Sequence, residues 1–334
     1  MIYDASSYVS FKDFGDKYHY IKDQISWAVI GLSGLIFFYL FDYKKLYLLS
    51  LPILLFSIVL LILVFLPGVG VYILGAHRWI NFKFFILQSS EFAKLALTIF
   101  LAAWFSNREK GRFLAFLLLT GIVIALIIAE PDMGTAIIIL LIALTMYFLS
   151  GAPLRQFFGM VPVVAILGFL AVKFAPYRAQ RLTTFFDTNA SPQTYSYHVR
   201  QILIALGSGG LTGVGFGNSL QKYAYLPEST TDSIFAIIAE EVGFVGSALI
   251  LGAYALLVLV GFRIAERAKD SFGKFLAAGI TTLIAVQALI NLASQTALLP
   301  LTGVPLPFIS YGGSALIVNL SAIGILLNIS KQSK

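Results

Sequence analysis

The chain is built from long apolar runs separated by short polar linkers. A transmembrane helix needs about 20 consecutive apolar residues, and nine runs reach or approach that length. They cover residues 24–41, 47–66, 92–105, 113–128, 135–149, 157–174, 234–262, 275–299 and 309–329. The pattern predicts an all-α polytopic membrane protein with about nine transmembrane helices.

Basic residues in the linkers indicate how these helices are oriented. They gather at residues 44–45, 108–112, 155, 263–274 and 331–334, on alternate linkers. Because cytoplasmic loops are enriched in lysine and arginine, we expect these linkers inside the cell. We expect the N-terminal segment and residues 67–90, 129–134, 175–233 and 300–308 outside. An external N-terminal segment with three lysines is hard to translocate, which favours a further span ahead of it.

Composition supports a membrane protein and narrows its chemistry. With 59% hydrophobic and 12% charged residues in 334, the chain is too apolar for a soluble globular protein. The 23 Lys and Arg against 16 Asp and Glu give a net charge of +7. We interpret this excess as the enrichment of basic residues in cytoplasmic loops rather than as a sign of a nucleic-acid partner. No cysteine is present, which excludes disulfides and thiolate metal sites. We expect one domain over residues 1–334.

The long external segment, about residues 175–233, carries its own structural signals. Apolar residues at helical spacing predict an interfacial helix over residues 197–206, namely Val199, Ile202, Leu203 and Leu206. Glycines between residues 207 and 217 predict turns. The segment also contains four basic residues, Arg178, Arg181, Arg200 and Lys222. Such charges are typical of a solvated face near anionic headgroups.

The stretch from residue 225 to residue 243 concentrates carboxylates at the edge of an apolar run. Glu240 and Glu241 lie inside the run, where charges are costly and usually mark a functional site. Asp232 lies just before it, with Glu228 one turn earlier, and a partly desolvated carboxylate there can serve as a general base. The alternative for Asp232 is a helix N-cap near residue 233.

Three charged residues near the second external linker allow two interpretations each. Arg78 beside Trp79 is either an aromatic-belt anchor or a guanidinium fork for a pyrophosphate. Glu91 and Lys94, three residues apart at a helix start, can pair. Glu91 can also complement a helix dipole behind a Ser89 or Ser90 cap, while Lys94 either snorkels to the interface or binds a lipid phosphate.

The remaining candidates lie in two turns. Asp132 follows Pro131 in a tight turn, where capping of the next helix is the simpler role. The bend at residues 305–314 contains Ser310 and two glycines that allow close backbone approach. No glycine-rich phosphate loop and no metal-ligand spacing is present. We expect no cofactor and no structural metal, and leave a divalent-cation dependence open.

Several of these motifs occur in one order that resembles a known family. They are Gly75-Ala-His-Arg-Trp-Ile, Ser90-Glu-Phe-Ala-Lys94, Glu130-Pro-Asp-Met-Gly-Thr, Arg181-Leu-Thr-Thr-Phe-Phe-Asp187, Gly209-Gly-Leu-Thr-Gly-Val-Gly-Phe-Gly, Leu226-Pro-Glu, Thr231-Asp232, Glu240-Glu241 and Pro300-Leu-Thr-Gly-Val-Pro-Leu-Pro-Phe-Ile-Ser-Tyr-Gly-Gly-Ser. Together they resemble the SEDS family (shape, elongation, division and sporulation) of polytopic peptidoglycan glycosyltransferases. Residues 218–228 look more like its FtsW and SpoVE branch than like RodA. The family commonly has ten spans, and its first has no counterpart here.

The resemblance implies polymerisation of lipid II, the undecaprenyl-pyrophosphate-linked disaccharide peptide, at the outer face of the bacterial cytoplasmic membrane. Asp232 matches the family's catalytic aspartate and is the expected base. Expected substrate-binding residues are Arg78, Glu91, Lys94, Asp132, Gln201, Glu228, Glu240, Glu241 and Ser310. Expected partners are a class B penicillin-binding transpeptidase and other division or elongation proteins.

The sequence departs from the family pattern at three positions, but Asp232 itself matches the pattern. Thr230 and Ser233 stand where the family commonly has histidine and phenylalanine, and Ser89 where it commonly has proline. Three alternatives stay open: a RodA-like elongation polymerase, a lipid II flippase or transporter, and a non-catalytic scaffold. A transporter predicts polar residues and broken helices at the bilayer midplane.

Overall fold

The computed structural model describes residues 2–73, 76–82, 85–107, 113–173, 179, 185, 195–223, 226–228 and 230–333. The chain forms two compact units that interleave along the sequence. The first comprises Met1–Ser26, Pro162–Leu256 and Gln287–Gly312, and the second Trp27–Val161, Leu257–Val286 and Gly313–Lys334. The boundary between them falls within four helices, which are α2 (His19–Leu40), α7 (Leu154–Lys173), α10 (Ile234–Arg267) and α11 (Ser271–Gln295).

The nine predicted spans each correspond to a helix of the described residues. Besides the four helices above, they are α3 (Lys45–Leu63), α4 (Ser89–Ser106), α5 (Phe113–Ala129), α6 (Met133–Leu149) and α12 (Gly313–Ser333). Helices α2, α3, α10, α11 and α12 are long and apolar enough to cross a membrane, while α5, α6 and part of α7 are shorter apolar helices. The prediction of an all-helical polytopic membrane protein is therefore confirmed for the membrane part of the chain.

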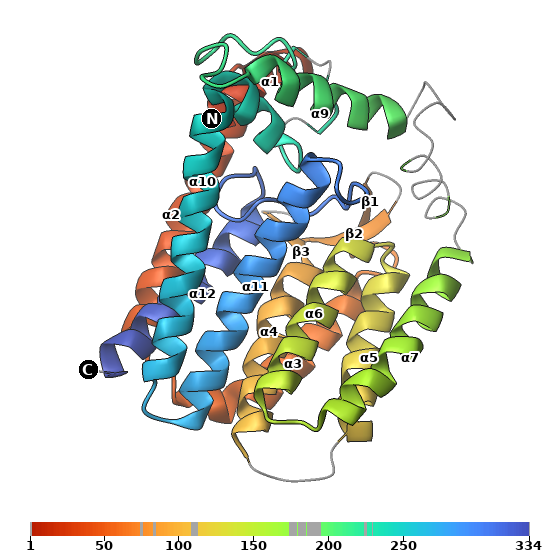
Figure 1. Cartoon of the computed structure of the whole chain (residues 1–334), viewed down its shortest axis with the longest axis vertical. Helices are drawn as coiled ribbons and strands as arrows, with labels where there is room; N and C mark the ends of the chain where they lie inside the picture. Colours follow the sequence, from red (N-terminus) through yellow and green to blue (C-terminus); the bar gives the residue numbers. More distant parts are fainter. Residues whose placement is uncertain are drawn as a thin grey trace. The chain divides into compact units, whose positions relative to one another are not determined.

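In the second unit, the helices pack around α4. Helices α3, α4, α5 and α6 run side by side (Figure 1), and α4 contacts α3, α6 and α12. Most of α4 is buried, including polar residues in its first two turns. This burial places any charged side chain of α4 inside the unit rather than at a lipid-facing surface.

A small antiparallel sheet in this unit was not predicted. Its strands β1 (Gly70–Ile73), β2 (Ala76–Asn81) and β3 (Ile86–Gln88) pair in the order β1-β2-β3 within the expected external linker 67–90. Trp79 is paired with Gln88, the residue directly before α4. The sheet therefore fixes Arg78 on β2 close to the start of α4. An all-α description is wrong for this linker.

In the first unit, two helices lie outside the predicted spans. Helix α1 (Ile2–Phe14) occupies the polar N-terminal segment, and α9 (Tyr195–Gly209) contains the predicted interfacial helix. The face of α9 that carries Val199, Ile202 and Ala205 is buried, and it packs with Ala5 of α1 and with Ile234 of α10. Helix α9 therefore belongs to a hydrophobic core.

Helix α10 is interrupted near its start, and the glycine-rich turn after α9 fills the break. Gly243 has φ 68° and ψ −166°, which lies outside the helical region. Four backbone bonds join the break to the turn: Val214 N to Glu240 O (3.0 Å), Gly215 N to Glu241 O (3.1 Å), Phe244 N to Gly210 O (2.9 Å) and Val245 N to Leu211 O (3.1 Å). A broken helix at the edge of a membrane needs such partners for its freed backbone groups.

Candidate active site

Asp232 lies in a tight turn two residues before the first residue of α10. The Glu228 carbonyl accepts hydrogen bonds from the backbone N–H groups of Thr231 (3.2 Å) and Ser233 (3.1 Å). The Thr231 hydroxyl lies 2.8 Å from Glu228 Oε2 and 3.0 Å from Asp232 Oδ1. Glu228 is exposed and Asp232 is partly buried. The carboxylate of Asp232 is therefore oriented by its own turn while keeping access to solvent.

Helix α11 fixes the backbone of this turn from the other side. The buried side-chain amide of Asn291 donates to the carbonyls of Asp232 (2.9 Å) and Val304 (2.8 Å). One turn earlier on α11, Gln287 donates to the Pro305 carbonyl (3.0 Å). The Asp232 turn and the segment 303–305 are thus held together by two amides on one helix face.

Gly303 lies beside the Asp232 carboxylate. It is exposed and has φ +72°, and a Cβ atom built on it would lie 3.9 Å from Asp232 Oδ2. A side chain here would be strained and would stand against the carboxylate.

Two further predicted site residues belong to the same unit. Ser310 is buried, and its hydroxyl accepts from the Leu306 backbone N–H at 2.8 Å, which closes the predicted bend. Gln201 is half-buried on α9. On the same helix, His198 Nε2 lies 2.7 Å from the hydroxyl of Ser233, the residue after Asp232. The sequence had pointed to Ser233 only as a departure from the family pattern.

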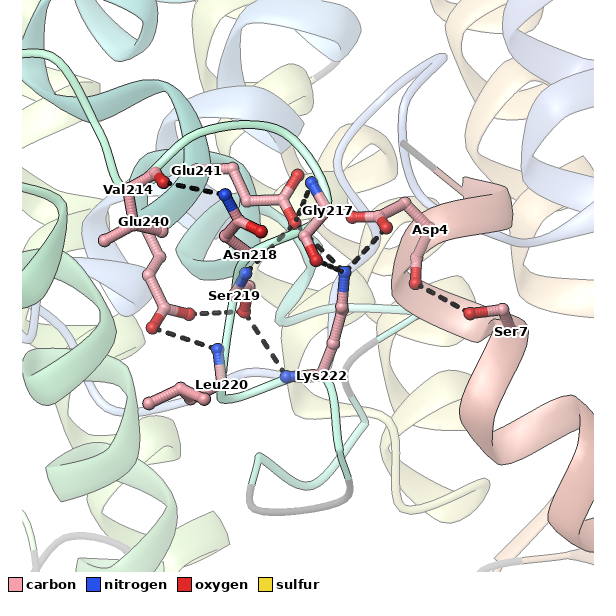
Figure 2. A network of polar contacts seen from close by, with 10 residues as sticks. All are labelled: Asp4, Ser7, Val214, Gly217, Asn218, Ser219, Leu220, Lys222, Glu240 and Glu241. Atoms are coloured by element: carbon pink, nitrogen blue, oxygen red, sulfur yellow. Dashed lines mark hydrogen bonds and ion pairs between the residues drawn. The ribbon is translucent and has the colours of Figure 1, made fainter.

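Glu240 and Glu241 bind the loop that follows the glycine-rich turn (Figure 2). Glu240 accepts from the Ser219 hydroxyl, from Leu220 N at 3.4 Å and from Ser208 at 3.3 Å. Glu241 Oε1 accepts from Gly217 N at 3.1 Å and from Ser219 N at 3.4 Å. Both carboxylates are almost fully buried. They hold residues 217–220 against α10.

Lys222 is the cation of this network. Its Nζ lies 2.7 Å from Asp4 Oδ1 and 3.5 Å from Glu241 Oε1, and it also donates to the Gly217 carbonyl at 2.6 Å. The Lys222 side chain is only 6% exposed, so its interpretation as part of a solvated basic face is wrong. Arg200 is exposed, as expected. Arg178 and Arg181 lie outside the described residues.

Asp4 joins α1 to this cation. Burial raises the pKa of the Asp4 carboxyl, but its hydrogen bonds to Glu241 and Lys222 outweigh that effect and hold the pKa below its ordinary value. The carboxylates of Asp4 and Glu241 therefore face the same ammonium group, although they come from α1 and α10.

The second unit contains a separate polar cluster at the start of α4. Lys94 Nζ lies 2.8 Å from Glu91 Oε1, and both side chains are almost completely buried. The predicted pairing is confirmed, and snorkelling of Lys94 to an interface is wrong because the side chain is 0% exposed. Gln88 occupies the N-cap position of α4, so the predicted cap at Ser89 or Ser90 is also wrong.

These two serines instead link α4 to the turn between α5 and α6. Ser89 donates to Glu130 Oε1 at 3.0 Å and Ser90 to Asp132 Oδ2 at 3.3 Å. Asp132 also accepts from the Thr135 backbone N–H at 3.1 Å and from its hydroxyl at 2.8 Å. The predicted capping of α6 by Asp132 is confirmed.

The Arg78 side chain forms hydrogen bonds to backbone carbonyls of this turn. Its Nε donates to the Glu130 carbonyl at 3.1 Å, and Nη2 donates to the Pro131 carbonyl. Glu130 itself is fully buried, and burial raises its pKa to about 8; Ser89 and Arg78 oppose this rise and Asp132 adds to it. Glu130 is therefore largely protonated at neutral pH.

No group of three or more His, Cys, Asp or Glu side chains within the described part of the chain is placed to hold a metal ion. The site residues predicted from the sequence do not include Asp4, Ser219, Lys222, Glu130 or Asn291. Asn291 and Ser219 are neutral residues whose importance depends on distant partners. Glu130 carried a signal, since a carboxylate beside proline in a turn between two apolar runs is unusual.

Comparison with known proteins identifies the class of this polytopic helical protein. The FtsW/RodA/SpoVE family of cell cycle proteins matches residues 1–334. Over 340 residues the chain is 39% identical to the "Probable peptidoglycan glycosyltransferase FtsW" of Geobacter metallireducens, covering 100% of this chain and 91% of that protein. It is 39% identical over 341 residues to stage V sporulation protein E of Bacillus subtilis, covering 100% and 93%.

Solved structures of similar proteins support the same family. A chain of a peptidoglycan synthase complex that coordinates polymerization and crosslinking superposes with a TM-score of 0.81 at 26% identity, covering 99% of this chain and 95% of that one. The rod shape determining protein RodA of Thermus thermophilus superposes with a TM-score of 0.70 at 27% identity, covering 99% and 93%. The chain belongs to the SEDS (FtsW/RodA/SpoVE) family.

Proposed function

We propose that this protein is a peptidoglycan glycosyltransferase that polymerises lipid II into glycan strands at the outer face of the cytoplasmic membrane. The observation that carries the proposal is the Asp232 turn, in which the Thr231 hydroxyl bonds the partly exposed carboxylate and the Asn291 amide bonds the backbone carbonyl of the same residue. The names of the full-length relatives support the same reaction.

In the proposed reaction, Asp232 removes the proton from a hydroxyl of the acceptor sugar. The hydroxyl oxygen forms a bond to the anomeric carbon of the donor sugar, and the bond from that carbon to the pyrophosphate oxygen breaks. Undecaprenyl pyrophosphate leaves with the bonding electrons. A positioned general base typically contributes about 10²–10⁴-fold to the rate. No nucleotide is needed, because the donor is already activated.

The other candidate residues divide into three proposed roles. Arg78 and Lys94 are proposed to counter the charge of the pyrophosphate, with Glu91 and Asp132 orienting them. Glu240 and Glu241 hold the loop 217–220, so we propose that they position the segment leading to Asp232. Gln201, Glu228 and Ser310 are proposed to shape the substrate site around the Asp232 turn.

A role in cell division is proposed from the FtsW names of the relatives, with elongation as the alternative. A class B penicillin-binding transpeptidase is the proposed partner, and the relative in a peptidoglycan synthase complex supports it. Deletion of the gene distinguishes the two roles: filamentous cells with unfinished septa support division, and rounded cells support elongation.

The test of the activity uses purified full-length protein in liposomes with lipid II. Glycan strands from the native chain, and lipid II binding without glycan from Asp232→Asn, are expected. Two outcomes overturn the proposal: undiminished glycan from Asp232→Asn, or movement of lipid II across the bilayer with no glycan from the native chain.

A further inference from the structure

Four aromatic rings of the first unit form a cluster between the end of α1, the first turn of α2 and the bend before α12. Phe14 stacks on His19 with ring centroids 3.9 Å apart, and Tyr20 contacts both of these rings edge to face. Tyr20 also contacts Tyr311 edge to face, with centroids 5.0 Å apart. Phe14 and His19 are exposed, and Tyr20 and Tyr311 are partly exposed. These four residues, the aromatic platform, therefore present ring surface that a ligand can reach.

The aromatic platform borders the Asp232 turn. The backbone N–H of Tyr311 donates to the carbonyl of Thr230 at 2.9 Å, and Thr230 lies two residues before Asp232. Tyr20 interacts electrostatically with Glu228. The carboxylates of Glu228 and Asp232 in turn share one threonine hydroxyl. Two separate contacts thus place the platform beside the turn that carries the proposed base.

The first turns of α2 hold the platform in place. Asp23 accepts a hydrogen bond from the Tyr311 hydroxyl at 2.5 Å, and the side chain of Gln24 accepts one from the Gly312 backbone N–H at 3.3 Å. The Tyr311 ring is therefore fixed at its hydroxyl by α2 and at its backbone by the Asp232 turn. A group that is fixed in advance loses less conformational freedom when a ligand binds.

The charges around the platform restrict what can cover it. Glu228 and Asp13 are exposed, and both interact electrostatically with Tyr20. Exposed carboxylates need water, because transfer of a charge into hydrocarbon is costly, so lipid acyl chains do not fit here. A pyranose ring does fit. Its C–H face can pack on an aromatic ring, while the hydroxyl groups at its edge donate to neighbouring carboxylates.

We propose that the aromatic platform binds a sugar ring of the lipid-linked saccharide and holds that saccharide beside Asp232. The inference rests on the proposed glycosyl transfer and deepens it by assigning a saccharide-binding surface. The competing role for Tyr20 is that of an interfacial aromatic anchor, which contacts lipid headgroups.

The test measures the binding of two lipids that differ only in the saccharide. One is undecaprenyl pyrophosphate, and the other is the same lipid carrying the disaccharide of lipid II without its peptide. Each is titrated into the full chain in an Asp232→Asn background, with and without Tyr20→Ala. Contact with one aromatic ring contributes about 2- to 13-fold to an equilibrium constant. Tyr20→Ala is therefore expected to raise the Kd of the sugar-bearing lipid by about that factor and to leave the Kd of the sugar-free lipid unchanged.

Three further variants complete the comparison. Tyr20→Phe keeps the ring and removes only the hydroxyl, so it should retain the affinity for both lipids. Tyr18→Ala is the matched control, because it removes an exposed tyrosine two residues away whose ring stacks on Tyr3, and it should change neither Kd. If Tyr20→Ala does not fold, Phe14→Ala gives the same test, because that ring is 54% exposed.

The outcomes distinguish this inference from the proposed function. Equal weakening of both lipids by Tyr20→Ala shows an interfacial anchor and overturns the proposal. Unchanged binding of the sugar-bearing lipid overturns it as well, even when the native chain polymerises lipid II. Weakening of the sugar-bearing lipid alone supports the platform, even when the native chain makes no glycan.

Discussion

Replacement of Lys222 by methionine tests the buried charge network of the first unit most sharply. The substitution keeps most of the side-chain volume and removes only the ammonium group. It leaves the carboxyls of Asp4 and Glu241, which are 27% and 0% exposed, without their shared cation. Removal of one partner from a buried ion pair costs about 3–5 kcal/mol. Because Asp4 is partly exposed, we expect a loss of about 3 kcal/mol in the free energy of unfolding.

The chain offers a matched control for this substitution. Lys22 and Asp16 form an ion pair of nearly equal length, 2.8 Å, whose side chains are 68% and 42% exposed. Surface pairs contribute about 0–1 kcal/mol, so Lys22→Met is expected to have little effect. Comparison of the two pairs at equal geometry isolates the contribution of burial.

The assay is thermal unfolding of the purified protein in one detergent at pH 7. Roughly 2–4 °C per kcal/mol gives an expected fall of about 6–12 °C for Lys222→Met and less than about 4 °C for Lys22→Met. Addition of Glu241→Gln to Lys222→Met should recover part of the loss, because it removes one unpaired charge. Equal shifts for both lysine variants, or strictly additive losses in the double variant, would refute a buried network around Lys222.

Two further predictions concern other parts of the chain. Burial gives folded Glu130 a pKa of about 8 against an ordinary value of 4.5. Its contribution to stability is therefore fully present below about pH 4.5 and is lost as the pH rises from there to about 8. Glu130→Gln should flatten the fall in unfolding temperature over this pH range, and an unchanged slope would contradict the assignment. At Gly213, φ is +82° and a Cβ atom would lie 2.0 Å from the Glu241 carbonyl oxygen. Gly213→Ala should therefore lower both the unfolding temperature and the polymerisation rate. The control Gly207→Ala should change neither, because a Cβ atom there meets nothing within 4 Å.

Local spacing in the sequence predicted much of the fold and part of the site. Each of the nine apolar runs is a helix because its length and composition are sufficient signals. The Glu91–Lys94 pair and the Asp132 cap were predictable because both contacts join residues three apart on one helix or turn. Such contacts need no knowledge of the tertiary structure.

Contacts between distant residues could not be predicted from local spacing. Lys222 is buried because Asp4, more than two hundred residues away, packs beside it with Glu241. Arg78 contacts backbone carbonyls, and carbonyls carry no sequence signal. The strands β1–β3 are too short to stand out within a linker. In the sequence, Asn291 is a single asparagine in an apolar run. Only the tertiary structure shows that its amide donates a hydrogen bond to the Asp232 carbonyl.

The central claim is that Asp232 acts as the general base of glycosyl transfer. The most direct measurement is the initial rate of glycan formation at saturating lipid II for Asp232→Asn, with Asp16→Asn as control, since Asp16 is an exposed carboxylate paired with Lys22. Loss of a general base predicts a fall of about 10²–10⁴-fold for Asp232→Asn with lipid II binding retained, and an unchanged rate for Asp16→Asn. A rate for Asp232→Asn within threefold of the native rate would contradict the account.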